Sequence, residues 1–312
     1  MQTVELGRTG AEVSVAGLGC GGASRLGMAR GASTDDAANV VRRALDLGVT
    51  FIDTARAYGT EEAVGLGIAG RRDHVFLSTK SNPGRGEQML TAAELSESLE
   101  LSLKRLRTDH VDVFHLHGLG LDQYERAADS LVPELERQRA AGKIRYLGVT
   151  ERFGADTGHA MLARALPDDR FDIVMVGFNL LNPSARERVF AQTQARRVGT
   201  LIMFAVRRAL SNPAAAREAV AKLVASGAVD GEGLDAEDPL GFLREYAASG
   251  DLTEIAYRFC RHEPGADVIL TGTGDVAHLK ANLAAIQGPP LPEEALTRLR
   301  QLFGGVDSVS GN

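Results

Sequence analysis

Short apolar runs alternate with longer amphipathic segments along most of the chain. Some runs, such as Ile173-Val-Met-Val, are apolar at every position, which is typical of strands buried on both faces of a parallel sheet. In the segments between them, apolar positions recur at spacings of three and four, as in a helix that packs one face on a sheet. The pattern predicts eight strands, over residues 15–20, 50–53, 75–79, 111–115, 144–149, 172–178, 200–204 and 267–270, and helices over residues 35–47, 92–106, 122–141 and 184–197.

Capping residues mark the ends of the first helix. Ser33 or Thr34 can cap its start, Asp35 and Asp36 place acidic groups in its first turn, and Gly48 ends it. Eight β/α units in a chain of 312 residues fit a closed barrel better than an open, doubly wound sheet. We therefore predict the α/β class and a (β/α)8 TIM barrel, with residues 1–312 forming a single domain.

Two regions depart from this alternation. Residues 3–15 contain two glycines among short apolar stretches, which predicts a β-hairpin ahead of the barrel, covering its N-terminal end. Residues 207–251 contain prolines and glycines around a helix-like stretch at 214–225. Such a long loop between strands 7 and 8 is uncommon unless it is functional, and we expect it to lie over the C-terminal face of the barrel.

Composition narrows the class of protein. Hydrophobic residues make up 44% of the chain and charged residues 24%, as in ordinary soluble proteins. The net charge of −6 argues against a nucleic-acid partner. No stretch approaches the roughly 18–20 apolar residues of a membrane span, and the N-terminus lacks the apolar segment of a signal peptide. With two cysteines and no disulfide framework, the default location is the cytoplasm.

Four polar residues at strand ends carry the candidate chemistry. Asp53 ends the second strand, Tyr58 follows it, Lys80 ends the third strand, and His117 closes the fourth. In (β/α)8 enzymes, reactive groups project from the C-terminal ends of the strands, so these side chains should converge. A carboxylate, a phenol, an amine and an imidazole in one pocket can move a proton while a cofactor moves a hydride. This combination predicts an oxidoreductase.

The segment Phe51-Ile-Asp-Thr-Ala-Arg-Ala-Tyr-Gly resembles the Asp-Thr-Ala-x-x-Tyr-Gly signature of the aldo-keto reductase family. Lys80 and His117 match the other two members of that family's catalytic tetrad. The likeness also covers the opening Leu6-Gly-Arg-Thr-Gly, Leu18-Gly-Cys-Gly-Gly, Gly142-Lys-Ile-Arg-Tyr-Leu-Gly-Val and residues 270–283. It implies NAD(P)-dependent hydride transfer between nicotinamide and a carbonyl or alcohol carbon of a small-molecule substrate.

Tyr58 is the general acid or base that the resemblance implies. A phenol with an ordinary pKa of about 10 is a poor proton donor at neutral pH, and a nearby ammonium from Lys80 would lower that pKa. Asp53 would pair with Lys80 and keep it charged. His117 could donate a hydrogen bond to the developing alkoxide and fix the orientation of the carbonyl.

The resemblance also implies where the cofactor binds. Glycines after strand 1 allow close approach of the backbone, and the segment after strand 8 would receive a phosphate at a helix start. NADP(H) is favoured over NAD(H), although His278 stands where many relatives carry arginine and Asp275 would repel a 2′-phosphate. The predicted cofactor residues are Gly21, Gly22, Thr150, Phe204, Arg207, Arg208, Gly272, Thr273, Gly274, His278 and Asn282.

Several positions differ from the family pattern. Phe204-Ala-Val-Arg-Arg replaces Tyr-Ser-Pro-Leu, so a ring is kept for the nicotinamide while Arg207 and Arg208 could compensate for a lost hydroxyl. Thr150 and Glu151 stand where relatives often show Ser-Asn. Met175 replaces a glutamine, which leaves Asn179 as a substitute grip on the carboxamide, and Gly118 replaces a tryptophan at the substrate pocket.

Two other functions stay open on the sequence. One is a nucleotide-binding sensor or regulatory subunit that keeps the site but turns over little. The other is a metal-assisted hydrolase that uses His115 and His117, which point to the same face of a strand. We favour a core role for His115 and predict no metal site. No segment resembles a dedicated interface helix, so the sequence predicts no particular oligomeric state.

Overall fold

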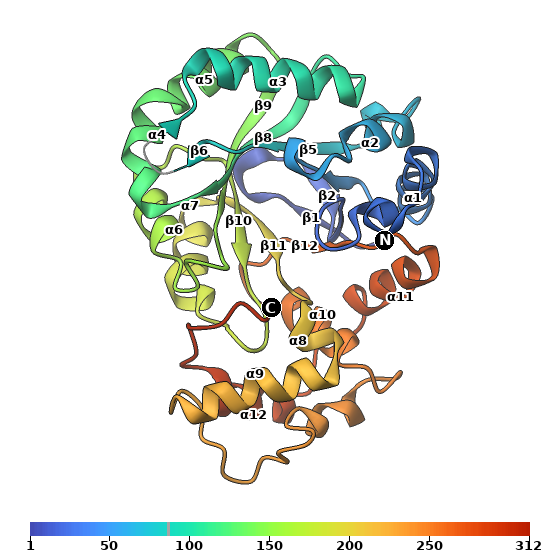
Figure 1. Ribbon diagram of the computed structural model, residues 1–312, viewed down its shortest axis with the longest axis vertical. Helices are drawn as coiled ribbons and strands as arrows, with labels where there is room; N and C mark the ends of the chain where they lie inside the picture. The colour runs from blue at the N-terminus through green and yellow to red at the C-terminus, as the bar shows by residue number, and fades with distance from the viewer. Residues whose placement is uncertain (86–87) are drawn as a thin grey trace.

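The computed structural model describes residues 1–85 and 88–312. Among them, eight parallel strands pair into a closed barrel in the order β10-β11-β12-β3-β4-β5-β8-β9, with helices around it (Figure 1). The predicted α/β class and (β/α)8 architecture are therefore confirmed. The strands are β3 (Ala16–Gly19), β4 (Phe51–Asp53), β5 (Phe76–Ser81), β8 (Val111–Leu119), β9 (Ile144–Glu151), β10 (Ile173–Gly177), β11 (Gly199–Met203) and β12 (Val268–Thr271).

β8 differs most from its prediction. It runs to Leu119, with an irregularity in its pairing to β9 between Leu116 and Leu119. His117 therefore lies within the strand, where the sequence placed it just past the strand's end. The sequence does not predict this extension, because polar residues and a glycine follow the apolar run. Gly118 continues the strand with a positive φ of 65°, which glycine adopts readily.

The N-terminal hairpin closes one end of the barrel, as predicted. β1 (Thr3–Glu5) pairs with β2 (Glu12–Ser14) in antiparallel register. Leu6 and Val13 are buried in the same apolar cluster as Phe51, which begins β4. The hairpin thus fills the barrel interior at the strand starts and leaves the opposite ends of the strands to polar residues. The remaining buried members of this inner core are Phe76, Val113, Ile173, Met175, Leu201 and Val268.

Helices pack around the barrel on a larger apolar core. α1 and α3 each begin with a capping box, formed by Ser33 with Asp36 and by Thr91 with Glu94. The helices are α1 (Thr34–Asp46), α2 (Glu61–Gly67), α3 (Ala92–Leu106), α4 (Tyr124–Ser130), α5 (Val132–Ala140), α6 (Ala160–Ala165), α7 (Ala191–Arg196), α8 (Arg208–Ser211), α9 (Pro213–Ala225), α10 (Leu252–Arg261), α11 (Val276–Ile286) and α12 (Glu293–Phe303).

Two predicted helices are interrupted. The helix predicted over 122–141 consists of a 3-10 turn at Leu121–Gln123, then α4 and α5, with Pro133 in the first turn of α5. Proline has no N–H group to continue the helix before it, which explains the break. The helix predicted over 184–197 begins instead as a π-helical turn, Arg186–Phe190, ahead of α7.

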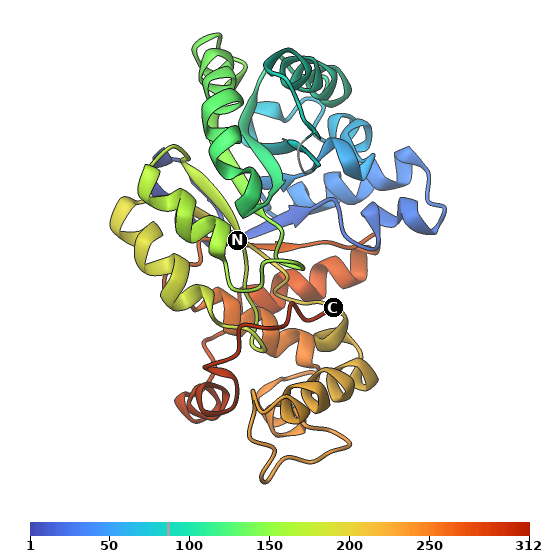
Figure 2. The same cartoon turned by 60° about the vertical axis from the view of Figure 1, so that its left-hand side comes forward.

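The predicted excursion between strands 7 and 8 is present and is largely helical. Residues 207–251 contain α8, α9 and the 3-10 segment Gly241–Tyr246, and α10 begins directly after them. Figures 1 and 2 show α9 at one end of the molecule, away from the barrel centre, and Arg298 of α12 lies over the ring of Phe242. The beginning of the segment borders the candidate site, where Arg207 lies over the ring of Phe204.

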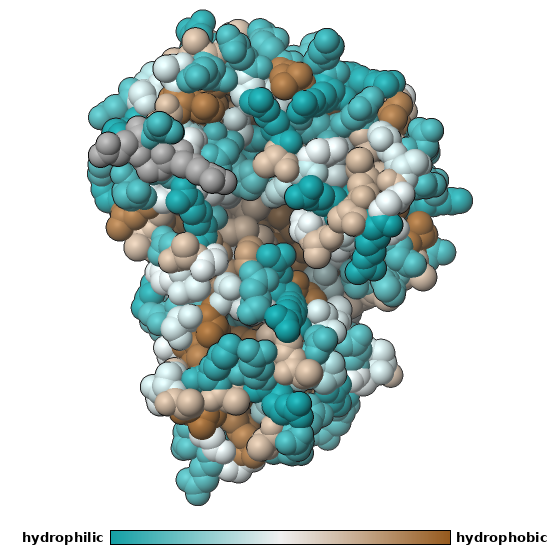
Figure 3. Space-filling view, in the orientation of Figure 1, coloured by the Kyte–Doolittle hydropathy of each residue, from teal (hydrophilic) through white to brown (hydrophobic). Residues whose placement is uncertain are grey.

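One face of the molecule is hollowed at its centre. Figure 3 shows apolar residues inside this hollow and mostly hydrophilic residues around it. Large apolar side chains that are exposed in the described ranges are Met1, Leu121 and Val224. Within the same ranges, none of the helices has the length and hydropathy needed to cross a membrane.

Candidate active site

A buried ion pair lies at the C-terminal ends of β4 and β5. Nζ of Lys80 donates to both carboxylate oxygens of Asp53, at 2.6 and 2.7 Å, and to the carbonyl oxygen of Thr54 at 2.7 Å. The Ser78 hydroxyl donates to Asp53 at 2.7 Å. Burial alone would lower the pKa of Lys80, but the Asp53 carboxylate and its other neighbours raise it above its ordinary value. Lys80 is therefore charged although it is fully buried.

Tyr58 faces this pair from the 3-10 turn Arg56–Tyr58. Nζ of Lys80 lies 5.0 Å from the centroid of the Tyr58 ring. The Tyr58 hydroxyl lies 3.4 Å from Nε2 of His117, and the two rings meet edge to face. A Cβ atom at Gly21 would lie 2.6 Å from the tyrosine ring. The four predicted residues thus meet in one place, and the glycine at position 21 makes room for one of them.

The pKa of Tyr58 differs from the expectation. Burial raises the pKa of Tyr58, and the positive charge of Lys80 offsets only part of that effect. The N–H groups of Lys80 have Asp53 and Thr54 as acceptors, and Lys80 still lowers the pKa of Tyr58 relative to burial alone. The predicted lowering by Lys80 is therefore present, but burial outweighs it in the protein alone. A raised pKa keeps the phenol protonated at neutral pH, which is the state that donates to a carbonyl oxygen.

The two histidines of β8 have different surroundings. Burial and the Lys80 charge lower the pKa of His117 from 6.5 to about 3, so its ring is neutral at neutral pH. His115 pairs in register with Lys80 and is fully buried. A Cβ atom at position 148 would lie 2.1 Å from Nδ1 of His115, so Gly148 leaves the space that this ring fills. These contacts agree with a core role for His115.

The metal-hydrolase hypothesis gains no ligand set from the structure. In residues 1–85 and 88–312, no group of three or more His, Cys, Asp or Glu side chains is arranged to hold a metal ion. Cys20 and Cys260 are both buried as free thiols. Among the residues that the structure describes, the pair His115 and His117 is therefore not joined by the further ligands that a catalytic metal requires.

A carboxylate caps the helix start that was predicted to receive a phosphate. Asp275 accepts hydrogen bonds from the N–H groups of Ala277 and His278, at 2.7 and 2.9 Å, at the beginning of α11. These bonds lower the pKa of Asp275, so it is negatively charged. Nδ2 of Asn282 donates to Thr271 at 2.9 Å, which directs this side chain toward β12.

The predicted cofactor glycines divide into two groups. A Cβ atom at Gly272 would lie 2.6 Å from the carbonyl oxygen of Gly19, and one at Gly274 would lie 2.3 Å from the backbone nitrogen of Gly27. These two glycines allow the loops after β3 and β12 to pack together. Gly22 has a φ of 68° and no atom within 4 Å of an added Cβ, so it is the open position. Thr273, between the packed glycines, accepts from the N–H of residue 275 at 3.1 Å.

Phe204 follows β11 with a φ of 66°. The guanidinium carbon of Arg207 lies 4.0 Å from the centroid of its ring. Nε of Arg207 donates to Oδ1 of Asn312 at 2.8 Å. Burial lowers the pKa of Arg207, while the nearby Tyr58 raises it. The structure therefore brings Arg207 to the ring that was predicted for the nicotinamide, whereas Arg208 is exposed at the start of α8.

The residues at the end of β9 are engaged inside the protein. Oγ1 of Thr150 accepts from the N–H of Gly118 at 2.7 Å. Glu151 accepts from the N–H of Gly177 at 2.7 Å and lies 3.0 Å from Nδ1 of His159. The carboxylate of Glu151 is thus turned away from the pocket, and it cannot replace the amide that relatives place there.

Asn179, the one substitute grip that the sequence suggested, is engaged elsewhere, and so is Met175. Met175 belongs to the inner barrel core. Asn179 donates to the carbonyl oxygen of Ser310 at 3.2 Å and accepts from two backbone N–H groups of its own loop. Beside Gly118, Nε of Arg152 donates to that glycine's carbonyl oxygen at 2.6 Å, so an arginine fills part of the space left by the missing tryptophan.

Phe153 is a site residue that the sequence reasoning missed. Its ring lies 5.3 Å from that of Phe204, edge to face, and 5.3 Å from that of His159, nearly parallel. A Cβ atom at Gly177 would lie 2.0 Å from the Phe153 ring, so the end of β10 must be glycine to admit it. An aromatic residue soon after β9, combined with a glycine at the end of the neighbouring strand, was the available signal.

Comparisons with known proteins agree with this geometry. The family model for the aldo/keto reductase family matches residues 18–303. Aldo-keto reductase YhdN of Bacillus subtilis (strain 168) is 29% identical over 327 residues, covering 94% of this chain and 91% of that protein. Aldo-keto reductase yakc [NADP(+)] of Schizosaccharomyces pombe is 36% identical over 151 residues, covering 45% of this chain and 43% of that protein. The solved structure of aldo-keto reductase AKR11C1 from Bacillus halodurans (holo form) has a TM-score of 0.76 at 25% identity, covering 98% of this chain and 97% of that one. This chain belongs to the aldo-keto reductase family and is an NAD(P)H-dependent oxidoreductase.

Proposed function

We propose that the protein transfers a hydride between nicotinamide and the carbonyl or alcohol carbon of a small molecule, with Tyr58 as the general acid or base. The convergence of Asp53, Tyr58, Lys80 and His117 at the ends of three adjacent strands carries this proposal. Bound nicotinamide supplies or accepts the hydride, which no side chain can do. Buried free thiols at Cys20 and Cys260 support the proposed cytoplasmic location.

Each of the four residues has a distinct role in this proposal. In reduction, Tyr58 donates its hydroxyl proton to the carbonyl oxygen, and in oxidation the phenolate takes it back. Lys80, held charged by Asp53, stabilises the phenolate that is left after the proton moves. His117 is neutral and donates its one N–H to the substrate oxygen, which fixes the direction from which the carbonyl enters.

The described residues fit a nicotinamide cofactor in the groups they expose. Gly22 offers an open backbone, Phe204 offers a ring, and Arg207 offers a partly buried cation beside it. We propose that these groups, with Thr273 and the exposed Arg208, hold the cofactor. The family and the NADP(+) in the name of the fission yeast relative favour NADP(H) over NAD(H). Asp275 opposes that preference, because a carboxylate repels the dianionic 2′-phosphate.

Replacing Asp275 with asparagine should increase the affinity for NADPH relative to NADH by about fivefold, since it removes one negative charge that repels the 2′-phosphate. Asn keeps the oxygen that caps α11, so the helix start should be preserved. Fluorescence titration with both cofactors measures the ratio. Asp36→Asn, at the capping box of α1, is the matched control and should leave the ratio unchanged. Equal gains for both cofactors at Asp275→Asn would contradict the charge argument.

The reduction rate should be insensitive to the ionisation of His117 over the physiological range. Because the pKa of His117 is about 3, kcat/KM for a neutral aldehyde should show no loss from this ring between about pH 8 and pH 5. His117→Gln, which is neutral at every pH, should lower kcat/KM without changing the shape of the profile. An acidic limb near pH 6–7 that disappears in His117→Gln would show that the ring titrates normally.

The direct assay of the proposed function follows the oxidation of NADPH and NADH in the presence of 4-nitrobenzaldehyde. We expect cofactor fluorescence to change on binding and the aldehyde to be reduced. A protein that binds cofactor but stays inert across sugar, steroid and aromatic carbonyls would instead fit the sensor or regulatory subunit. The inward turn of Glu151 is the observation that favours this alternative, because it removes one expected grip on the carboxamide.

A further inference from the structure

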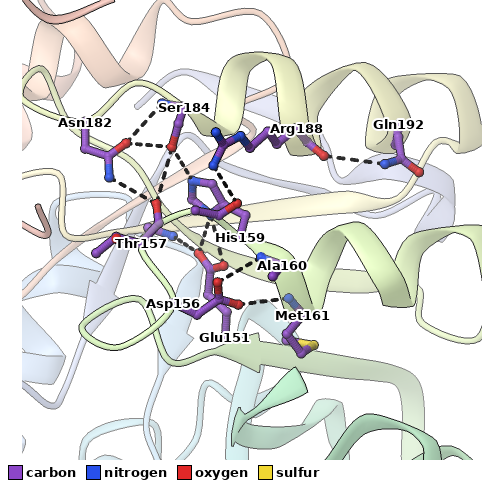
Figure 4. Close-up of polar contacts among 12 residues, drawn as sticks. Glu151, Asp156, Thr157, His159, Ala160, Met161, Asn182, Ser184, Arg188 and Gln192 are labelled. Carbon is purple, nitrogen blue, oxygen red and sulfur yellow. Dashed lines mark hydrogen bonds and ion pairs between the residues drawn. The ribbon is translucent and has the colours of Figure 1, made fainter. Parts of the chain in front are cut away.

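A continuous set of hydrogen bonds links Glu151, at the end of β9, to Asn182 (Figure 4). From Asn182 it continues to the backbone of Val309. Nδ1 of His159 lies 3.0 Å from Glu151, and Nε2 of the same ring lies 3.0 Å from Oγ of Ser184. That oxygen lies 2.6 Å from Oδ1 of Asn182, whose Nδ2 donates to the carbonyl oxygen of Val309 at 2.8 Å. We call Glu151, His159, Ser184 and Asn182 the polar ladder. His159 and Asn182 are fully buried, and Glu151 is 3% exposed.

The direction of each hydrogen bond in the ladder follows from its neighbours. Nδ2 of Asn182 faces two carbonyl oxygens, those of Thr157 at 3.1 Å and of Val309 at 2.8 Å, so this atom must be the amide nitrogen. Oδ1 of Asn182 can then only accept, which commits the hydroxyl proton of Ser184 to it. Oγ of Ser184 must therefore accept from Nε2–H of His159.

These directions exclude a nucleophilic triad. The order Glu151, His159, Ser184 has the spacing of a serine nucleophile with its base and orienting acid. A nucleophilic serine must give its proton to the imidazole, yet here the imidazole gives one to the serine. The hydrogen bonds of the polar ladder therefore fix the positions of its side chains and do not activate Ser184 as a nucleophile.

The ladder keeps its bonds in either protonation state. If Glu151 is ionised, His159 carries protons on both nitrogens. If Glu151 holds the proton, it donates to Nδ1 of a neutral ring, and the bond to Ser184 is unchanged. The other charged groups near the pair are Asp156, which caps α6 through the N–H groups of residues 160 and 161, and Arg188, which pairs with Asp307. Its geometry therefore does not depend on the charge of the pair.

Two branches lead from the ladder to Phe204. On one side, the His159 ring stacks on Phe153, whose ring meets Phe204 edge to face. On the other side, Asn182 holds Val309, and the residues that follow it along the chain contact the site. Gly311 accepts from the N–H of residue 209 at 3.0 Å, and Asn312 accepts from Arg207, which covers Phe204.

We propose that Glu151 and His159 are positioning residues for cofactor binding, which they serve by fixing the ring of Phe204 and the guanidinium of Arg207 through the polar ladder. The inference rests on the proposed function, because it assigns these two groups to the nicotinamide end of the cofactor. Glu151 occupies the position where relatives often carry the amide that grips the carboxamide. In this chain, Glu151 instead supports the ring of Phe204 and the guanidinium of Arg207 through the polar ladder.

The test compares Glu151→Leu with Glu151→Gln in fluorescence titrations with NADPH. Leucine removes every bond to His159 and Gly177, and it should weaken NADPH binding about tenfold. Glutamine keeps an acceptor for Gly177 and donates to Nδ1 of a neutral His159, so it should bind NADPH within about twofold of wild type. His159→Asn gives a second variant, since asparagine tolerates the positive φ of 61° at this position. It should weaken binding as leucine does at position 151.

A merely structural role is separated by a control and by a double-mutant cycle. Glu134→Leu removes another buried glutamate, on α5, and should lower the melting temperature without changing NADPH binding. In a Phe153→Leu background, Glu151→Leu should weaken NADPH binding by less than the roughly tenfold loss in the wild-type background, because the branch through Phe153 is already cut and only the branch through Asn182 remains. Effects that simply multiply, or Glu151→Leu and His159→Asn variants that bind NADPH like wild type, would overturn the inference.

The failure of the inference can be told apart from the failure of the proposed function. If wild type neither changes NADPH fluorescence nor reduces 4-nitrobenzaldehyde, the proposed function fails before any variant is compared. A readout without cofactor checks the ladder itself. Long-range nitrogen–proton spectra of the histidine rings should show a proton on Nε2 of His159, lost from the spectrum in His159→Asn. A His159 ring protonated only at Nδ1 would show that Ser184 is the donor and would contradict the ladder.

Discussion

Replacing Tyr58 with phenylalanine should lower kcat for carbonyl reduction by about 10²–10⁴-fold, the range that general acid–base catalysis contributes. The change removes the only hydroxyl proposed to reach the substrate oxygen, while the ring that packs over Gly21 stays in place. NADPH binding should therefore change by less than about threefold. Steady-state kinetics with 4-nitrobenzaldehyde and fluorescence titration with NADPH measure the two quantities separately.

Tyr124→Phe is the matched control for this experiment. Tyr124 is buried and its hydroxyl donates to Asp168 at 2.8 Å, outside the site. This substitution should reduce stability slightly and leave kcat unchanged. If Tyr58→Phe retains turnover, or loses turnover only together with NADPH binding, another group delivers the proton and the proposed role of Tyr58 is wrong.

The barrel and the meeting of the four candidate residues could be predicted because both depend on local pattern. Apolar runs of strand length identify parallel strands, and parallel strands bring their C-terminal ends to one face. Asp53 and Lys80 are the polar residues at such ends, so their contact follows from topology alone. The resemblance to the Asp-Thr-Ala-x-x-Tyr-Gly signature then places Tyr58 in the loop that follows β4. Strand order and the family resemblance together were enough to predict that these groups meet.

Properties that depend on packing could not be predicted in the same way. The net pKa of Tyr58 is set mainly by burial, which spacing does not reveal, so only the lowering by Lys80 could be predicted and not the larger rise that burial causes. The ladder joins residues 151, 159, 182, 184 and 309, which no periodicity connects. From the sequence, Glu151 was interpreted only as the loss of an amide that would contact the carboxamide, because no sequence pattern links it to its partner His159. Only the folded arrangement shows that the carboxylate is turned inward.

The second large effect concerns the buried pair of Asp53 and Lys80. Asp53→Asn leaves the fully buried ammonium of Lys80 without a counter-charge, and removing one partner of a buried ion pair typically costs about 3–5 kcal/mol in the free energy of unfolding. Urea unfolding should show this loss, and kcat should fall as well because the phenolate of Tyr58 loses its charged neighbour. Stability and activity then change together, so the single variant cannot separate them.

The double variant Asp53→Asn with Lys80→Met separates stability from catalysis. With both charges gone, a pair of similar volume should recover most of the lost stability, within about 1–2 kcal/mol of wild type, while activity stays low.

The dependence of stability on pH gives a second test of the pair. The pKa of Lys80 is raised above its ordinary value of 10.5, so the folded state holds this proton more tightly than the unfolded state. The pair's contribution to stability is fully present below pH 10.5 and is lost as the pH rises through the higher folded-state pKa. Removing Lys80 also removes a charge that lowers the pKa of Tyr58, so the alkaline contribution of the tyrosine would grow in the double variant. The comparison is therefore made with Tyr58→Phe in both proteins, and the protein that keeps the pair should then lose more stability above pH 10.5 than the one without it. Equal alkaline losses in the two proteins, or a double variant as unstable as Asp53→Asn, would show that the pair does not hold Lys80 charged.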